Sequence, residues 1–525
     1  MSERARSTWA WGWADKFPDE ATRRGLIPLA AALVPGAAPA LRPLPSDEVL
    51  VHDAPVAIPA PLAAFATQDP RERALHTRGR AFPDLVAGFA GDFAGAPAIV
   101  ATPRDAAEVA RVLDVCATRN WAVVPFGGGT SVVGGVDAAL ARRGRQAAVS
   151  LDLGGLSGVR EVDVTSRLAR IGAGTLGPAL EDQLAPRGLT LRHFPQSFEL
   201  STLGGWLATR AGGHYATGPT HIDDHAHALT LVTPRGSIAT HAHPASGAGP
   251  EPIRAFLGSE GALGVITEAW MRVVPKPQWR ASASFAFRAF EDGVAAAREL
   301  ARSGLQPANA RLLDATEARL HRVRFDGASV LLVAFESADH PVGPWLARAV
   351  EITRGCGGDL VKQEEADTAA TWRSAFFDAP YLQSALLSIG ILADTFETCC
   401  TWTQFPALHA AVTAAVTRAL REECGGGALA CRFTHVYPDG PAPYYTFVGA
   451  LREGGELQQW AALKSAASEA LASAGGTITH HHAVGRTHRP WYDRERPPLF
   501  AQLLRAQKRT LDPAGVLNPG VLIDG

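Results

Sequence analysis

Hydrophobic and polar positions along residues 95–275 alternate between the periods of strands and helices. Residues 96–103, 121–126 and 147–153 are short apolar runs that predict buried strands. Residues 103–120 place Val109, Leu113 and Cys116 on one helical face, with Pro103 in the first turn. Residues 160–164 and 167–174 predict a hairpin, and residues 175–188 predict a helix that ends at Gly188.

The pattern changes after residue 275. Apolar, β-like runs at residues 281–290, 328–337, 395–402, 431–440 and 443–450 are separated by helical patterns, among them residues 291–304 and 345–357. Strands grouped in this way predict an antiparallel sheet covered by helices, and therefore an α+β protein with a second domain.

We expect four segments. Residues 1–90, rich in Pro and Ala, form an extended arm that packs on the body, either anchored by Trp9, Trp11 and Trp13 or exposing them to a partner. Residues 91–276 form the first domain and residues 277–475 a cap. Residues 476–525 are rich in turns and return to the first domain.

Composition and charge narrow the class of protein. The 525 residues carry a formal net charge of −2, so a basic nucleic-acid-binding surface is not expected. Six cysteines without a CxxC pair predict neither a disulfide framework nor a zinc ribbon. The N-terminus lacks the apolar core of a signal peptide, and the prolines of residues 26–41 exclude a membrane span. We therefore expect a cytoplasmic protein.

Residues 123–135, VVPFGGGTSVVGG, form a loop that suits an anion. The loop lacks the GxxxxGK[ST] pattern of nucleotide triphosphatases and the GxGxxG pattern of a Rossmann crossover. Its consecutive backbone N–H groups and two hydroxyls would instead form a nest for the diphosphate of a dinucleotide. A glycine-rich surface turn is the alternative.

Two further glycine turns favour a long ligand. Residues 196–213 (QSFELSTLGGWLATRAGG) again place hydroxyls beside paired glycines, and residues 258–265 (GSEGALGV) supply a third turn. Three such turns in one domain indicate a ligand wrapped by backbone.

These blocks, together with LDPAGVLNPG at residues 511–520, resemble the FAD-binding domain of the vanillyl-alcohol oxidase/p-cresol methylhydroxylase (PCMH-type) superfamily. Within it, the RLLD, TFET, CRFTHVYPDG and THHHAVG blocks are most similar to the alkyldihydroxyacetonephosphate synthase family. The resemblance implies a PCMH-type FAD-binding domain of two subdomains, a cap domain and non-covalent FAD.

The resemblance also implies the cofactor contacts. These are Pro125, Phe126, Gly127, Gly128, Gly129, Thr130, Ser131, Gln196, Ser197, Ser201, Thr202, Gly205, Thr209, Arg210, Ala211, Gly212, Gly258, Ser259, Glu260, Gly261, Ala262, Leu263, Gly264 and Ile266. The synthases carry Asp at the position of Gln196 and Ser at that of Gly212.

Three consecutive histidines, His480, His481 and His482, are candidate catalytic residues. In an extended chain His480 and His482 would share one face. A polar strand end and a metal site are the alternatives. Flavin-dependent 2-hydroxyacid dehydrogenases of this fold carry a metal at positions where this chain has His435, Ala442 and His481, so we expect no metal.

Tyr444 matches the tyrosine for which the family implies an acid/base role, and nearby positive charge would favour its phenolate. The alternative is that Tyr444 is only an aromatic residue of the core. We expect its neighbour Tyr445, which points to the opposite face, to lie in the core. Gln383 stands where the synthases have a substrate-binding arginine, and an amide cannot neutralise a phosphate. Arg311, which could also be structural, and Arg486, close to the histidines, are further candidates for substrate binding.

The resemblance implies an exchange of acyl for alkyl on dihydroxyacetone phosphate through a flavin N5 adduct, as in ether-lipid synthesis. The alternative is an FAD-linked oxidoreductase, a dehydrogenase or oxidase acting on a small molecule with a hydroxyl or amine. A regulatory flavoprotein without activity is a third interpretation, which the His–Tyr set disfavours. We expect a small or lipid-like substrate, peripheral membrane contact at most, and a homodimer.

Overall fold

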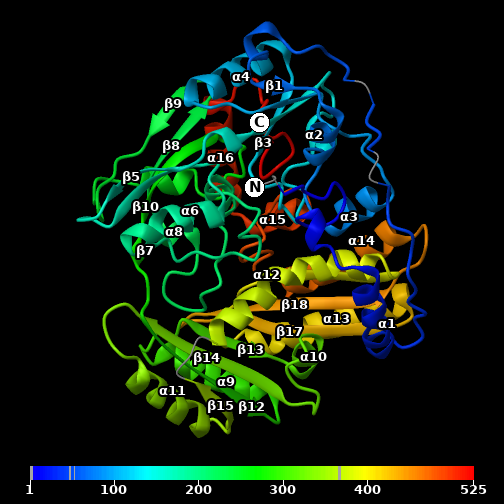
Figure 1. Cartoon of the computed structure of the whole chain (residues 1–525), viewed down its shortest axis with the longest axis vertical. Helices are drawn as coiled ribbons and strands as arrows, with labels where there is room; N and C mark the ends of the chain where they lie inside the picture. The colour runs from blue at the N-terminus through cyan, green and yellow to red at the C-terminus, as the bar shows by residue number, and fades with distance from the viewer. Residues whose placement is uncertain (1–3, 47–48, 53, 365–367, 525) are drawn as a thin grey trace.

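The computed structural model describes residues 4–524 apart from residues 47–48, 53 and 365–367. Figure 1 shows two regions: β1–β10 and the C-terminal helices above, and a large sheet with its helices below. The predicted α+β class is confirmed. Every described helix is too short or too polar to cross a bilayer.

The upper region contains two main sheets. The strands are β1 (Ala66–Thr67), β2 (Ile99–Ala101), β3 (Ala122–Phe126), β4 (Ala148–Asp152), β5 (Val159–Asp163), β6 (Leu168–Gly172), β8 (Ala226–Thr233), β9 (Gly236–Ala239) and β10 (Val265–Arg272). One sheet has the order β1-β2-β4-β3, with β2, β4 and β3 parallel, and the other is antiparallel with the order β5-β6-β10-β8-β9. A separate two-stranded sheet pairs β7 (Leu189–Thr190) with β11 (Val274–Pro275).

Helices fill the spaces around these sheets. They are α2 (Pro70–Leu75), α3 (Phe82–Phe89), α4 (Ala106–Arg119), α5 (Ala138–Ala141), α6 (Gly177–Leu184), α7 (Leu203–Thr209), α8 (Ile222–His225), α15 (Arg489–Glu495) and α16 (Pro498–Leu511). Helix α4 begins later than predicted, because Asp105 caps it through the N–H of Glu108 and Pro103 precedes the cap.

The lower region is one antiparallel sheet of seven strands, in the order β15-β12-β14-β13-β17-β18-β16. The strands are β12 (Trp279–Phe287), β13 (Asn309–Leu313), β14 (Ser329–Ser337), β15 (Asp359–Glu364), β16 (Ile391–Glu397), β17 (Gly427–Val436) and β18 (Pro441–Ala450). The associated helices are α9 (Phe290–Arg302), α10 (Ala315–Leu320), α11 (Gly343–Gly355), α12 (Thr368–Leu387), α13 (Phe405–Cys424) and α14 (Glu456–Ser473).

The two faces of this sheet have different neighbours. Phe433 and Tyr445 point to the face covered by α9, α11 and α13, where each belongs to an apolar cluster. The alternate residues Arg432 and Tyr444 point to the opposite face, toward a cavity. The strand period therefore aims polar side chains at a single region between the sheet and the upper domain.

The N-terminal arm is more structured than its composition predicts. Residues Glu20–Leu33 form α1 in spite of Pro28. The side chain of Asp19 caps this helix, and Ala30 and Leu33 pack in a core with residues of β16 and β18. Tertiary packing thus outweighs the low helix propensity of this segment.

Candidate active site

The glycine loop after β3 lies directly against the second glycine block. A Cβ atom on Gly128 would be 1.9 Å from the carbonyl oxygen of Leu200, and one on Gly127 would be 2.3 Å from Oγ1 of Thr202. Gly129 has a φ of +63°, which favours glycine. Among the described residues, no acceptor is found for the backbone N–H groups of residues 127–132. This run of free donors fits the diphosphate of FAD.

The C-terminal segment joins the first glycine loop to the third. The side-chain amide of Asn518 donates to the carbonyl oxygens of Gly135 (2.9 Å) and Glu260 (2.8 Å). The ammonium of Lys508 donates to the carbonyl oxygens of Ala262 and Leu517, both at 2.7 Å. Residues 516–518 also pair with Val123 at the edge of β3.

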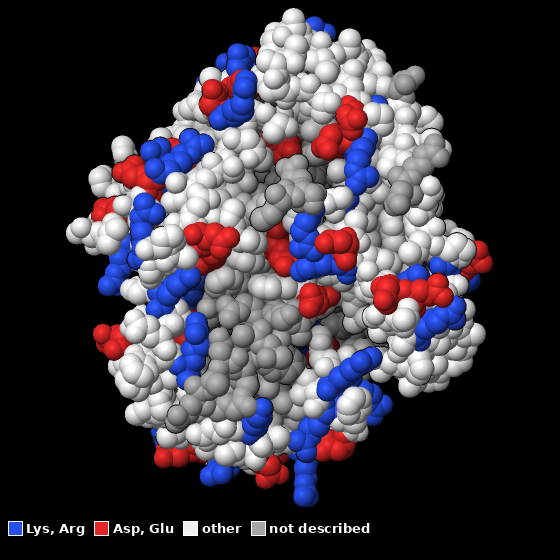
Figure 2. Space-filling view, in the orientation of Figure 1, with Lys and Arg blue, Asp and Glu red and all other residues white. Residues whose placement is uncertain are grey.

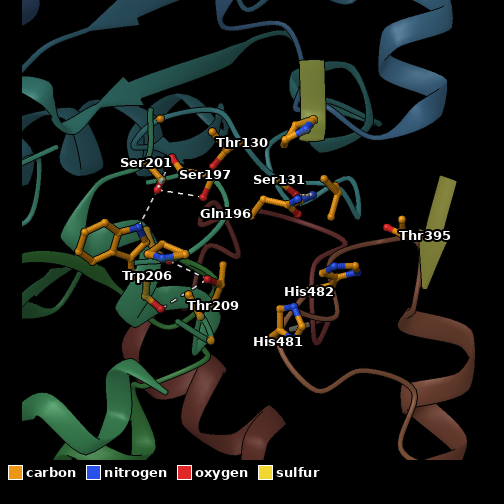
Figure 3. A pocket seen from close by; sticks show the side chains of 18 of the residues that line it. Thr130, Ser131, Gln196, Ser197, Ser201, Trp206, Thr209, Thr395, His481 and His482 are labelled. Atoms are coloured by element: carbon orange, nitrogen blue, oxygen red, sulfur yellow. Dashed lines mark hydrogen bonds between the residues drawn. The ribbon is translucent and has the colours of Figure 1, made fainter. Parts of the chain in front are cut away.

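One cavity connects the three glycine turns with the cap sheet. Figure 3 shows hydroxyls of Ser197 and Ser201 on one side of it and the rings of His481 and His482 on another. The predicted residues that line it are Pro125, Phe126, Gly127, Gly128, Gly129, Thr130, Ser131, Gln196, Ser197, Ser201, Thr202, Gly205, Thr209, Ala211, Gly212, Glu260, Gly261, Gly264, Ile266, Arg311, Gln383, Tyr444, His481 and His482. The structure brings these residues together, and their individual roles remain predictions.

Other predicted site residues have side chains outside this cavity. Arg210 donates to the Asp223 carboxylate at 2.6 Å, and Gly258 lies against the Arg210 side chain. Arg486 binds the carbonyl oxygens of Gly134 (2.7 Å) and Pro519 (2.6 Å), which makes it a structural cation. Ser259, Ala262, Leu263 and His480 are likewise absent from the lining. Leu263 belongs to the apolar core of the upper region.

The three histidines form a bend, so the predicted strand is wrong. His481 and His482 line the cavity and His480 faces away from it, which reverses the predicted pairing of His480 with His482. The buried Glu397 carboxylate explains the bend, because it accepts the backbone N–H groups of His480 (2.6 Å), His481 (3.1 Å) and His482 (3.0 Å). The chain therefore wraps around an anion instead of extending.

Electrostatics in this bend favour an ionised glutamate and neutral imidazoles. Burial opposes the Glu397 charge, but the positive charge that the neighbouring histidines carry when protonated, together with the hydroxyl of Thr479, lowers the pKa of Glu397 well below the usual value. Burial also lowers the pKa of His481, while Glu397, 3.6 Å from its Nδ1, opposes that shift. His481 is thus a neutral base with a carboxylate placed to stabilise its protonated form.

The nitrogens of His435, His480 and His481 lie within 4.8 Å of one another, a spacing at which a metal could bind. Both His435 nitrogens already contact protein oxygens, Nε2 with the Gly213 carbonyl and Nδ1 with the Thr434 hydroxyl, each at 3.0 Å. Nδ1 of His480 lies 3.1 Å from Nδ1 of His481. A hydrogen-bonded network accounts for these contacts, and the expectation of no metal stays a prediction.

Tyr444 is a buried phenol beside the histidines. Its ring centroid lies 5.9 Å from that of His481, and its hydroxyl donates to Oγ1 of Thr395 at 3.0 Å. Burial raises its pKa, although the Arg432 guanidinium, 4.1 Å from the ring centroid, acts in the opposite direction. The predicted tendency toward phenolate is therefore wrong for this arrangement, and Tyr444 is a neutral acid.

Two buried guanidiniums lie at the cap side of the cavity. Arg432 forms an ion pair with Glu317, and Arg311 lies on the neighbouring strand β13. Burial and the proximity of Arg432 lower the pKa of Arg311 to about 9, so it stays protonated at neutral pH. Burial would raise the pKa of Glu317, but Arg432 and His321 hold it at about 2.

Gln383 lines the cavity from α12. Its amide nitrogen donates to the carbonyl oxygen of Ala393 at 2.9 Å and to Oδ1 of Asp394 at 3.2 Å. Asp394 also forms an ion pair with Lys464 at 3.7 Å. The position therefore lies beside a carboxylate that is already paired with a cation.

Several lining residues were not predicted individually. Arg432 and Thr434 alternate on β17 within the CRFTHVYPDG block, so the strand period could have identified them. Asn518 lies in LDPAGVLNPG, which was recognised only as a block. Trp11 comes from the arm, and no local signal indicates that it reaches the cavity.

Comparisons with protein families cover most of the chain. Residues 97–241 match the FAD binding domain family, and residues 276–522 match the family of FAD linked oxidases, C-terminal domain. The alkyldihydroxyacetonephosphate synthase of Dictyostelium discoideum is 30% identical over 486 residues, which are 87% of this chain and 78% of that protein. The enzyme of the same name from Caenorhabditis elegans is 30% identical over 495 residues, covering 87% and 81%.

More distant relatives and solved structures agree with this placement. The glycolate oxidase subunit GlcD of Bacillus subtilis is 24% identical over 86% of this chain and 96% of its own. A solved structure of alkyldihydroxyacetonephosphate synthase has a TM-score of 0.81 at 25% identity and covers 98% of both chains. p-Cresol methylhydroxylase with bound substrate has a TM-score of 0.69 at 16% identity, covering 88% and 94%, which is a likeness of fold.

Proposed function

Because the chain belongs to the alkyldihydroxyacetonephosphate synthase family of FAD-dependent enzymes, we propose that it exchanges the acyl group of an acyl-dihydroxyacetone phosphate for a fatty alcohol, without net oxidation. When bound, FAD supplies the electrophile for the reacting carbon. The polypeptide then has three tasks, which are to hold the hydrocarbon chain, to neutralise the phosphate and to move protons.

The observation that carries the proposal is an apolar part of the cavity lining. This part consists of Leu320, Ala379, Pro380, Leu382, Leu386 and Val448. Three of these residues, Leu320, Leu386 and Val448, belong to the core that joins α10, α12 and β18. Such a lining suits a long alkyl chain, because burying each CH₂ group contributes about 0.8 kcal/mol.

Arg311 and Arg432 support the binding of a phosphate in this cavity. Both guanidiniums line the cavity and both are buried close to the Glu317 carboxylate. A buried dianion requires such a partner, because its desolvation without pairing is costly. Arg486 and Arg489 do not serve this purpose, since they bind backbone carbonyls and carboxylates elsewhere.

Tyr444 and His481 suit the proton steps. In the proposed reaction, His481, neutral and backed by Glu397, takes a proton from a carbon next to the substrate carbonyl. Tyr444, a neutral phenol, donates a proton to a departing oxygen. The alternative function, an FAD-linked oxidoreductase, is favoured by Gln383, which supplies no charge for an anionic substrate.

A synthase assay on the parent protein and on Gln383→Arg tests this proposal. With an acyl-dihydroxyacetone phosphate and a long-chain alcohol, we expect measurable exchange by the parent and faster exchange by the variant. The added guanidinium can bind the substrate phosphate, because the neighbouring Asp394 is already paired with Lys464. Gln404→Arg, outside this cavity, is the control. An inactive parent whose flavin is bleached anaerobically by a hydroxy acid would instead establish the oxidoreductase.

The proposal also includes non-covalent FAD, a lipid-like substrate, a cytoplasmic location and a homodimer. Acid precipitation should leave all the yellow colour in the supernatant, and colour in the pellet would contradict non-covalent binding. Sedimentation velocity distinguishes a dimer from the 55.3 kDa monomer.

A further inference from the structure

A second cavity lies next to the histidine bend and shares no lining residue with the first cavity. Its lining includes Cys399, Tyr437, Asp439, Thr477 and Glu495. Asp439 and Glu495 are exposed, so this cavity opens to solvent. Tyr437 lies in the wall of this cavity. The hydroxyl of Tyr437 contacts Nε2 of His480, the histidine that faces away from the first cavity.

A continuous line of short contacts joins the two cavities. Nδ1 of His481 lies 3.1 Å from Nδ1 of His480, and Nε2 of His480 lies 2.8 Å from the hydroxyl of Tyr437. That hydroxyl also lies 3.0 Å from Oγ1 of Thr220. Each member is both a donor and an acceptor, which is the requirement for passing a proton along a chain.

We propose that His480 and Tyr437 form a relay that carries protons between His481 in the first cavity and water in the second cavity. The inference rests on the proposed function only in that it takes His481 as the proton-accepting base. It assigns a task to His480, which does not line the first cavity and acts through His481.

The transfer balances without another reactant. His481 gains a proton on Nε2 and gives the Nδ1 proton to Nδ1 of His480. His480 gives its Nε2 proton to the oxygen of Tyr437, and Tyr437 gives its hydroxyl proton to water. Reversal of these steps brings a proton back. Glu397, 3.6 Å from Nδ1 of His481, stabilises the imidazolium formed at the start.

The chain offers a matched control for this idea. Tyr445 also forms a buried tyrosine–histidine contact, since its hydroxyl lies 3.1 Å from Nδ1 of His409. Tyr445 and His409 lie in the core under α13, on the face of β18 opposite to Tyr444. Tyr437→Phe and Tyr445→Phe therefore remove similar hydrogen bonds, and only the first interrupts the relay.

The test follows proton uptake when dithionite reduces the bound FAD, because this reduction consumes protons in the first cavity whatever the natural substrate is. Stopped-flow absorbance records flavin bleaching, and a pH-indicator dye records the proton uptake after correction for the protons that the oxidation of dithionite releases. In the parent and in Tyr445→Phe the two signals should coincide. In Tyr437→Phe and His480→Gln the uptake should lag by about tenfold or more, with flavin content unchanged.

Coincident signals in both relay variants would overturn the proposal. A stoichiometric transition metal in the purified holoenzyme that is lost in His480→Gln would overturn it as well, because the histidine nitrogens would then be ligands. A lag in the relay variants of a parent that fails the synthase assay would retain the relay and reject the proposed reaction. The two inferences therefore fail separately.

Discussion

Gly128 shows how closely backbone approaches backbone in the cofactor site. The space that a methyl group would need is occupied by the carbonyl group of Leu200, 1.9 Å from the Cβ position, and neither loop can yield without moving the free N–H donors. A change at one atom therefore alters the geometry of the whole anion nest.

Gly128→Ala should abolish stable FAD binding while the rest of the protein folds. The added Cβ separates the first two glycine blocks and turns the donors of residues 127–132 away from the diphosphate. The ratio of flavin absorbance to protein absorbance after gel filtration measures this loss. Gly247→Ala, where nothing lies within 4 Å, is the control, and full FAD content in Gly128→Ala would contradict the assignment.

His481→Ala and Tyr444→Phe should each lower turnover by a factor of about a hundred to ten thousand, the usual contribution of a placed proton donor or acceptor. Both variants should keep FAD, because neither side chain holds the backbone N–H groups of residues 127–132 in place. Tyr445→Phe, on the other face of β18, should turn over at the parent rate. Parent-like turnover in either test variant would remove that residue from the mechanism.

The sequence predicted many of the residues that the structure brings together in one cavity, because glycine-rich motifs with special backbone requirements can be recognised without a structure. It failed for side chains whose direction depends on distant contacts. His480 faces away because Glu397, 83 residues earlier, binds the backbone of the bend. Arg486 follows the histidines directly, yet its partners Gly134 and Pro519 turn it away from the cavity. The burial that raises the pKa of Tyr444 has no local signature either.

At the scale of elements, periodicity predicted the strands β3, β4, β12, β14 and β18 well, because each is a bounded apolar run. It missed α1, whose composition is unfavourable and whose stability comes from packing against β16 and β18. The histidine bend was wrongly predicted as a strand, because the Glu397 carboxylate that bends the chain is remote in sequence.

The N-terminal arm packs against α12 and the glycine loop. The indole of Trp11 is buried with Leu200 and Tyr381, and its backbone N–H donates to Oγ of Ser384 at 3.1 Å. Arg6 donates to the carbonyl oxygen of Gly128 at 2.5 Å. The arm thus touches the two elements that enclose the cofactor cavity.

Trp11→Ala should weaken the packing of the N-terminal arm against α12 and the glycine loop. Loss of the buried indole should lower the free energy of unfolding by about 3 kcal/mol and increase the rate of FAD release, because the arm no longer covers α12. Urea denaturation and the fluorescence of released FAD after dilution measure the two effects. Trp279→Ala, at a residue 43% exposed, is the control, and an unchanged release rate in Trp11→Ala would contradict the role of the arm.

At the scale of the whole molecule, two buried histidines of the upper region are important for stability. Burial lowers the pKa of His225 at the end of α8 and of His488 at the start of α15 to about 4 each. Both are neutral in the folded protein at pH 7. Lys, Arg, Asp and Glu, by contrast, lie interspersed over the face shown in Figure 2.

These histidines should make the protein sensitive to acid. The unfolded chain binds protons near pH 6.5 and the folded protein only near pH 4, so stability is full above pH 6.5 and falls as the pH decreases to 4. Each group contributes about 3 kcal/mol across this window. Urea denaturation at pH 7.5, 6 and 5 should show the decline, and His225→Asn should reduce its slope while exposed His241→Asn should not. A flat curve for the parent would contradict this expectation.

Residues 516–518, which pair with β3 and bring Asn518 to the first and third glycine turns, belong to the last ten residues of the sequence. A ribosome makes the diphosphate loop almost 400 residues before it makes this clamp, since Gly127 precedes Asn518 by 391 positions. Upper-region helices and strands can form during translation. Firm capture of FAD, however, requires the contacts of Asn518, so a chain that lacks residues 516–525 should fold in large part but be colourless.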